Sequence, residues 1–160
     1  MVTAASVTVA AIYYIVNLRE TTRNRRATLA NNIAKNLYSD AGVRRWIDLV
    51  TMSWKDNDDF MKRYDHRVNL DNYVNRATFW NTCEVLGYQY RSGLIDLESL
   101  DAICGVYVTS GWMKFKPLIE EYRRNGDYSK DRYRNWEYLA GELTKYHETN
   151  VELSRWEDKS

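Results

Sequence analysis

The hydrophobic pattern divides the chain into an uncharged N-terminal run and a longer stretch with helical periodicity. The run Val2–Leu18 contains no charged side chain, and the first charged residue is Arg19. Farther along, apolar residues recur at spacings of three and four, which is typical of amphipathic helices. The pattern predicts an all-α protein in which a single N-terminal transmembrane helix continues into a small multi-helix bundle.

The uncharged run is the strongest signal in the sequence. A helix of this length rises about 25 Å, a little less than the roughly 30 Å hydrocarbon core of a bilayer, and tilt or local thinning covers the difference. Its alanine, serine and threonine residues favour close packing on another transmembrane helix. We interpret positions 1–18 as a membrane span. The residues of this span include Val2, Ala5, Val9, Ile12, Ile15 and Leu18.

Two alternatives to a span stay open. Thr3, Ser6, Thr8 and Asn17 dilute the hydrophobicity, as in a buried core helix or a helix that binds a partner. An amphipathic helix of that kind would nevertheless carry charges on its wet face. A cleaved secretory signal normally begins with positive charge, whereas here the charges follow the apolar run.

Four arginines follow the span: Arg19, Arg23, Arg25 and Arg26, with Glu20 as the nearby acidic residue. Positive charge collects on the cytoplasmic side of membrane spans. This rule places the helical remainder in the cytoplasm and the N-terminus outside. The same arginines suit the anionic headgroups of membrane lipid.

Periodicity and break signals define the remaining elements. The first helix is expected over 3–38, and its part at 19–38 forms a stalk and the first bundle helix. Further helices are expected at 41–53, 58–64, 71–90, 94–108, 112–124 and 132–147. Pro117 predicts a kink or a helix start near Lys116, because proline lacks the backbone N–H. The resulting organisation is a span at 1–18, the stalk at 19–38, a helical domain at 39–126, and a C-terminal helix and tail at 127–160.

Local signals refine this picture at the ends and faces of the helices. Asp96 has the position of an N-cap, and Gly93 that of a left-handed residue after a helix. The Asp-rich segment at 54–59 favours helix capping over a calcium loop, since it lacks the central glycine and final glutamate of that loop. In the second helix, an apolar stripe is expected to face the core, and it consists of Val43, Trp46, Ile47 and Val50.

Composition narrows the class of protein. The net charge is +1, and one proline with seven glycines argues against a β-sandwich or barrel. Six tryptophans and thirteen tyrosines supply an unusual number of large rings for a core or an interface. We expect four of the tryptophans to lie in the core or at an interface: Trp46, Trp80, Trp112 and Trp136. Cys83 and Cys104 are expected to be reduced, buried thiols.

Candidate chemistry is sparse. The sequence has no Walker loop, GxGxxG, HExxH or CxxC motif, and its two histidines, His66 and His147, lie far apart. We therefore expect no metal, no cofactor, no nucleic-acid partner, no small-molecule substrate and no enzymatic activity. Glu84 lies on an otherwise apolar wall of the helix at 71–90. A carboxylate there is costly unless paired, so it is a proton carrier, a ligand, or a structural partner of an arginine or tyrosine.

Several short motifs resemble an uncharacterised family of small bacterial and archaeal proteins. They are Arg26-Ala27-Thr28, Phe79-Trp80 with Glu84 and Gly87, the segment at 91–96, and Trp112 with Pro117-Leu118-Ile119 and Arg123. The resemblance covers roughly residues 10–124. It implies one N-terminal span and a helical cytoplasmic domain of unknown function, and it supplies no catalytic residues.

These observations lead to two functional hypotheses. The first is a non-catalytic, membrane-anchored accessory subunit that packs by its span on other transmembrane subunits and docks through its aromatic-rich helical domain. The second is a membrane-tethered sensor or signalling module whose bundle binds a ligand or a soluble partner. An enzyme that acts near the membrane is a third, weaker possibility.

Overall fold

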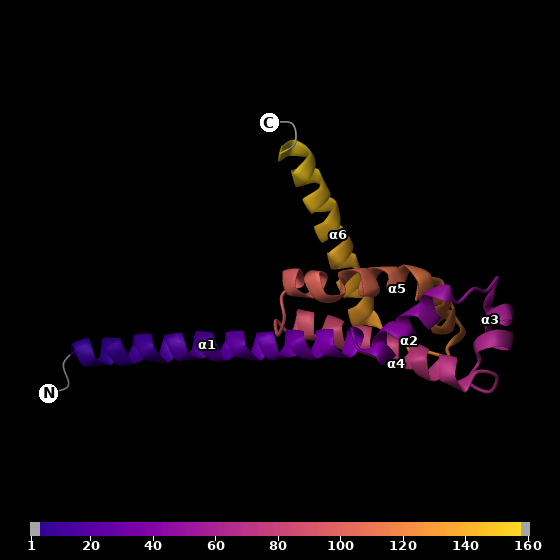
Figure 1. Ribbon diagram of the computed structural model, residues 1–160, viewed down its shortest axis with the longest axis horizontal. Coiled ribbons are helices and arrows are strands. Elements are labelled where there is room, and N and C mark those ends of the chain that lie inside the picture. Colours follow the sequence, from indigo (N-terminus) through magenta and orange to yellow (C-terminus); the bar gives the residue numbers. More distant parts are fainter. Residues whose placement is uncertain (1–3, 158–160) are drawn as a thin grey trace.

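The computed structural model describes the backbone of residues 4–157 and the side chains of residues 7–149. Every regular element in this part of the chain is an α-helix, as the sequence predicted (Figure 1). The helices are α1 (Ala4–Leu37), α2 (Asp40–Thr51), α3 (Asn57–Tyr64), α4 (Leu70–Arg91), α5 (Leu97–Asn125) and α6 (Arg134–Glu157).

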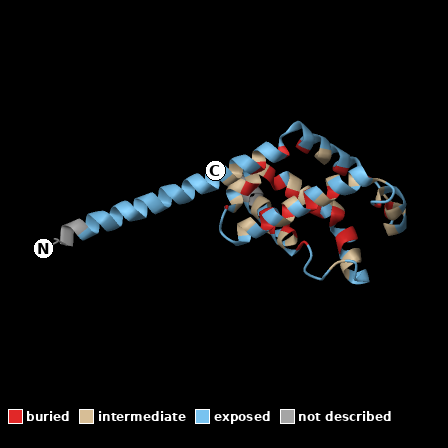
Figure 2. Cartoon of the chain, turned by 90° about the horizontal axis from the view of Figure 1, so that it is seen from below, coloured by how far each residue is buried: buried red, intermediate tan, exposed pale blue. Residues whose placement is uncertain are grey.

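The bundle is built around α4, α5 and α6, and α6 packs against both of the others. The C-terminal half of α1 lies along this bundle and contacts α5, whereas its N-terminal half projects far beyond it (Figure 1). The expected first helix over 3–38 thus agrees closely with α1. On the projecting half, the side chains from residue 7 onward are exposed on every side (Figure 2).

Polar side chains fix the starts of α2, α3, α4 and α5, and Asn69 does so for α4. Ser39 accepts a hydrogen bond from the Gly42 N–H at 3.1 Å, and Asp96 accepts one from the Ser99 N–H at 2.8 Å. Asp56 caps α3 through the Asp59 N–H, which explains the Asp-rich segment as helix capping. Gly93 has φ 69°, the left-handed conformation predicted for it.

The prediction of two separate helices at 94–108 and 112–124 is wrong, because the structure has one helix there. α5 runs without interruption from Leu97 to Asn125, so no break occurs at Thr109–Gly111 and no helix begins near Lys116. Gly111 is a packing position and not a turn, because a Cβ there would lie 2.6 Å from Cε1 of Phe79. The glycine therefore lets α4 and α5 approach each other within a continuous helix.

The predicted inner face of α2 is correct only for Trp46, which packs against the core. Val43, Ile47 and Val50 are 38–52% exposed, and the buried residues of this helix are Gly42 and Leu49. A Cβ on Gly42 would lie 2.3 Å from the backbone oxygen of Asn36, so the glycine face packs tightly on the end of α1. This close approach turns the remaining three residues of the apolar stripe outward.

The core contains side chains from all six helices and continues into α6. Trp136, Leu139 and Leu143 of α6 are fully buried in the same cluster as Trp80 of α4 and Phe115 of α5. The segments predicted at 39–126 and 127–160 therefore share one hydrophobic core.

Candidate functional site: the dock of α6 and the projecting half of α1

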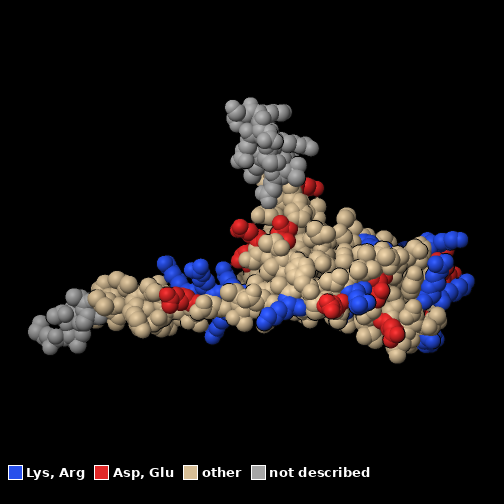
Figure 3. Space-filling model, in the orientation of Figure 1, with Lys and Arg blue, Asp and Glu red and all other residues tan. Residues whose placement is uncertain are grey.

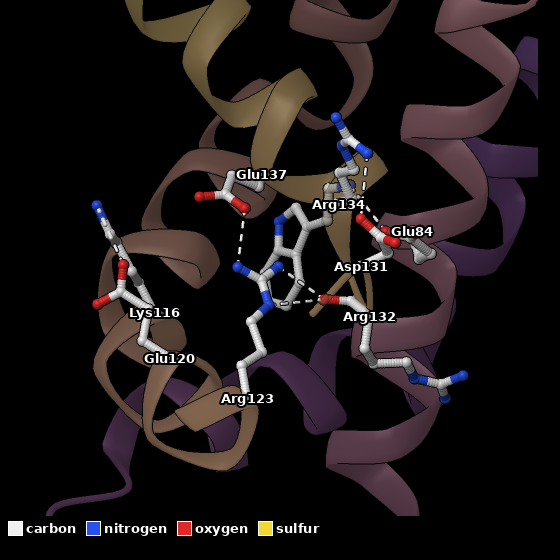
Figure 4. Close-up of polar contacts among 9 residues, drawn as sticks. Glu84, Lys116, Glu120, Arg123, Asp131, Arg132, Arg134 and Glu137 are labelled. Carbon is white, nitrogen blue, oxygen red and sulfur yellow. Dashed lines mark hydrogen bonds and ion pairs between the residues drawn. The ribbon is translucent and has the colours of Figure 1, made fainter. Parts of the chain in front are cut away.

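Glu84 holds the start of α6 against α4. Its Oε1 accepts a hydrogen bond from Nδ2 of Asn135 at 2.8 Å, and its Oε2 accepts one from the Trp136 backbone N–H at 2.9 Å. The first backbone N–H groups of a helix lack partners within the helix and favour a negative charge. Glu84 thus caps α6 from a neighbouring helix (Figure 4). Of the roles that the sequence left open for Glu84, these contacts are structural, but the direct partners are an amide and a backbone N–H instead of an arginine or tyrosine.

Gly87 and Arg91 complete this dock on the same face of α4. A Cβ on Gly87 would lie 2.1 Å from the backbone oxygen of Asn135, so only glycine admits the approach of α6. Nη1 of Arg91 donates to Oδ1 of Asn135 at 2.9 Å. Glu84, Gly87 and Arg91 follow the three- and four-residue spacing of one helix face. Sequence reasoning identified Glu84 but missed Asn135, which no pattern singled out.

Arg123 joins the end of α5 to the start of α6. Nη2 and Nε of Arg123 donate to the backbone oxygen of Arg132 at 2.7 and 3.0 Å, and Nη1 forms an ion pair with Glu137 at 2.9 Å (Figure 4). Its guanidinium also lies 5.9 Å from the ring centroid of Trp112. Arg123 thus joins Glu84, Gly87 and Arg91 as a residue of the motifs noted in the sequence that serves this dock.

Three of the four tryptophans that we singled out fill the core. Trp80, Trp112 and Trp136 are 1%, 7% and 0% exposed, and the indole N–H of Trp136 donates to the Val108 carbonyl at 3.0 Å. Trp46 is half-buried and packs on the rings of Phe79 and Tyr107. These side chains are core residues and not a free docking face.

The two thiols are buried, and each histidine contacts an aspartate. Burial raises the pKa of Cys104 to about 12 and raises that of Cys83 as well, so both stay protonated thiols at neutral pH. His66 approaches Asp65, and His147 contacts Asp101 on α5. Among the described residues, no three histidine, cysteine, aspartate or glutamate side chains are grouped to hold a metal ion.

The projecting half of α1 exposes a continuous set of large apolar side chains. Ile12, Tyr13 and Tyr14 are 57–68% exposed, and no face of this segment is covered. The other exposed members of the set are Val7, Val9, Ile15, Val16 and Leu18. Within the described residues, no helix combines enough length and hydrophobicity to cross a bilayer. Val2, the first residue of the expected span, and the side chain of Ala5 lie outside the described set.

A basic groove adjoins the inner end of this apolar segment. The groove has a volume of about 600 Å³ and lies between α1 and the start of α5. Arg19, Arg23 and Arg26 line it, together with Leu18, Thr22, Ala27, Ala30, Asp96 and Ser99. Figure 3 shows an uncharged stretch of α1 followed by a group of Lys and Arg side chains. Arg25 points elsewhere and lines a separate groove with Thr21 and Asn24.

The family model described as a domain of unknown function, DUF4760, matches residues 1–143. The chain belongs to the DUF4760 family. No curated protein and no solved structure matches it.

The DUF4760 match covers both features described above, the projecting half of α1 and the dock of α6. It extends past the residues 10–124 of the predicted resemblance and includes Asn135 and Trp136 at the start of α6. The resemblance to an uncharacterised family is thereby confirmed. The membrane span and the prokaryotic origin that it implied stay predictions.

Proposed function

We propose that this DUF4760 protein is a non-catalytic, membrane-anchored accessory subunit of a larger membrane complex. The N-terminal half of α1 lies in the bilayer beside other transmembrane helices, and the helical bundle lies on the cytoplasmic side and docks onto a partner. One observation carries the proposal: the apolar segment from Val7 to Leu18 stands clear of the bundle and is exposed on all sides.

The energetic argument for an apolar environment is simple. Burial of one large apolar side chain contributes about 1.5–3 kcal/mol, so the exposed set on α1 gains more than about 10 kcal/mol when lipid or another helix covers it. Monomeric soluble proteins rarely leave such a contiguous apolar surface in water. The arginines that follow the segment suit the cytoplasmic membrane surface.

Exposed apolar side chains on the bundle support a docking partner. The outward stripe of α2 consists of Val43, Ile47 and Val50, and α5 exposes Val106 and Met113 by 66% and 71%. The polar dock of α6 supports a structural role for Glu84, because both of its carboxylate oxygens already bind the fold.

Membrane retention of an anchor variant tests the first half of the proposal. Ile12→Arg places a charge in the middle of the apolar segment, which costs about 2.5–3.5 kcal/mol in a membrane-spanning helix. We expect the wild-type chain to remain in membranes after an alkaline carbonate wash and Ile12→Arg to be released. Asn24→Arg is the matched control, because it adds the same charge to the exposed inner part of α1. Release of the wild-type chain by carbonate would refute the anchor.

The mass of the native particle after gentle detergent extraction tests the second half. A large particle with fixed partners supports an accessory subunit, and a lone protomer refutes it. Lys130→Cys reports the orientation, because it places a thiol in the exposed connection between α5 and α6. A membrane-impermeant thiol reagent should label this cysteine only after the cells are permeabilised. Labelling of intact cells would contradict a cytoplasmic bundle.

A sensor function is the second candidate, and one groove favours it. A largely apolar groove of about 440 Å³ between α1 and α4 is lined by Leu29, Ile33, Val85 and Gln89, among others. The buried Oε1 of Gln89 has no hydrogen-bond partner among the described residues. Val85→Trp fills this groove. If a cell extract of small molecules raises the melting temperature of the wild-type chain but not that of Val85→Trp, the sensor function gains the stronger support.

A further inference from the structure

The basic groove between α1 and α5 has the composition of a phosphate site at a membrane surface. Arg19, Arg23 and Arg26 follow one another at spacings of four and three, so all three lie on the face of α1 that borders the groove. Arg19 and Arg23 are exposed and form no ion pair with any described residue. Their guanidinium groups are therefore free to bind phosphate oxygens, for which arginine geometry is well suited.

Arg26 differs from the other two because the fold holds it in place. Its Nη2 donates to the Gly93 carbonyl at 3.3 Å, in the turn between α4 and α5. Asp96 lines the same end of the groove and is bound by the Ser99 N–H at 2.8 Å. Three cations and one carboxylate leave the groove with a net positive charge, and the uncompensated charge lies at the Arg19 and Arg23 end.

The position of the groove indicates whether a lipid phosphate or a free phosphate ion would fit it better. Leu18 lines the groove and is also the last residue of the exposed apolar segment of α1. A phosphate bound by Arg19 and Arg23 therefore lies next to a surface that suits acyl chains. A free phosphate ion would gain nothing from this apolar neighbour.

We propose that this groove binds the headgroup of an anionic phospholipid that carries a single negative charge. The inference rests on the proposed membrane anchor and specifies its lipid. Arg19 and Arg23 bind the phosphodiester, the acyl chains follow α1 toward Val7, and the uncharged end of the headgroup points to Asp96 and Ser99. The carboxylate of Asp96 disfavours a second negative charge, which selects phosphatidylglycerol over phosphatidic acid.

Lipid titration of the full chain in a neutral detergent tests this site, with bound lipids counted by native mass spectrometry. The probes are phosphatidylglycerol, phosphatidic acid and phosphatidylcholine with identical acyl chains. We expect phosphatidylglycerol to bind most tightly and Arg19→Gln with Arg23→Gln to weaken it about 25-fold, since one basic residue near an anionic surface is worth about fivefold. Arg25→Gln is the matched control, because it removes the same charge from another face of α1, and it should change the affinity less than twofold.

Three outcomes would overturn the site. Equal binding of phosphatidylcholine would show that the headgroup charge is not recognised. An equal loss in Arg25→Gln would show that the arginines attract lipid diffusely and form no site. Displacement of the lipid by inorganic phosphate at similar concentration would identify a general phosphate site instead.

The failure of the anchor has a different signature. The double variant should stay in membranes after a carbonate wash while it loses the preference for phosphatidylglycerol. Release of the wild-type chain by the same wash would remove the membrane anchor, whatever the lipid titration shows. Because Arg19 and Arg23 are exposed, the helical content of the variants should equal that of the wild-type chain by circular dichroism.

Discussion

Gly87→Ala should destabilise the bundle strongly, although alanine is the better helix former. The new Cβ would lie 2.1 Å from the backbone oxygen of Asn135 and 2.4 Å from its carbonyl carbon. Neither atom belongs to a flexible side chain, so the start of α6 must move by more than about 1 Å to restore an ordinary contact distance. Such a movement stretches the hydrogen bond from the Trp136 N–H to Glu84.

The magnitude follows from three contributions. Overpacking costs about 1–3 kcal/mol, a weakened hydrogen bond to a charged group costs about 1.5–3 kcal/mol, and replacement of glycine within a helix gains about 1 kcal/mol. The net loss in the free energy of unfolding is about 1.5–5 kcal/mol. With a urea m-value of about 2 kcal/mol/M, the midpoint of unfolding falls by about 0.8–2.5 M. Circular dichroism at 222 nm during urea titration of the full chain in mild detergent measures this midpoint.

Gly141→Ala on α6 is the matched control, because no atom lies within 4 Å of a Cβ at that position. The same substitution should there raise the free energy of unfolding by about 0.5–1 kcal/mol. The two variants therefore shift the midpoint in opposite directions. A midpoint for Gly87→Ala equal to or above that of the wild-type chain would refute the tight dock of α6.

Three further predictions concern the described side chains. Glu84→Gln should lower the free energy of unfolding by about 1–2 kcal/mol in the same urea assay, because an amide N–H₂ would face Nδ2 of Asn135. Glu148→Gln, at an exposed site of α6, should leave the free energy of unfolding unchanged. Iodoacetamide at pH 7.5 should alkylate Cys83 and Cys104 only after urea unfolds the chain, because burial raises the pKa of both thiols. Peptide mass spectrometry measures the alkylation, and rapid alkylation of the native chain would contradict this prediction. The Ser99 N–H lowers the pKa of Asp96, so this carboxylate stabilises the fold above about pH 4 and loses that effect as the pH falls through the lowered pKa. Asp96→Asn keeps a capping oxygen, so its stability should fall less steeply than that of the wild-type chain during acid titration. An unchanged slope would argue against the cap.

The sequence predicted those features that depend on local chemistry. The helix cap at Asp96 and the left-handed Gly93 were recognised because each acts within a few residues of its own backbone. The helix predicted at 132–147 corresponds to the first part of α6, where the buried residues Trp136, Leu139, Ala140 and Leu143 repeat with helical spacing.

The errors have a common cause in contacts between helices. Gly111 is a turn signal by its local propensity, and only the ring of Phe79 from α4 explains it as a packing position. Likewise, the orientation of α2 is set by the close contact between Gly42 and the end of α1. Asn135 was missed for the same reason, because its role is defined by Glu84 and Arg91, which lie far away in the sequence. A glycine within an apolar pattern can mark either a break or a close contact, and a single sequence does not distinguish the two.

The motif residues and the exposed surface of α1 serve different purposes, and this bears on what the family match conveys. The motif residues that dock α6 are Glu84, Gly87, Arg91 and Arg123. The motifs therefore reflect the fold of the bundle. The proposed membrane function depends instead on the composition of α1, which many apolar sequences satisfy. The two parts meet at Arg26, whose guanidinium binds the Gly93 carbonyl while the same side chain lines the basic groove. This contact ties α1 to the turn before α5, so in the proposed membrane complex a movement of α1 would act on the bundle through this turn.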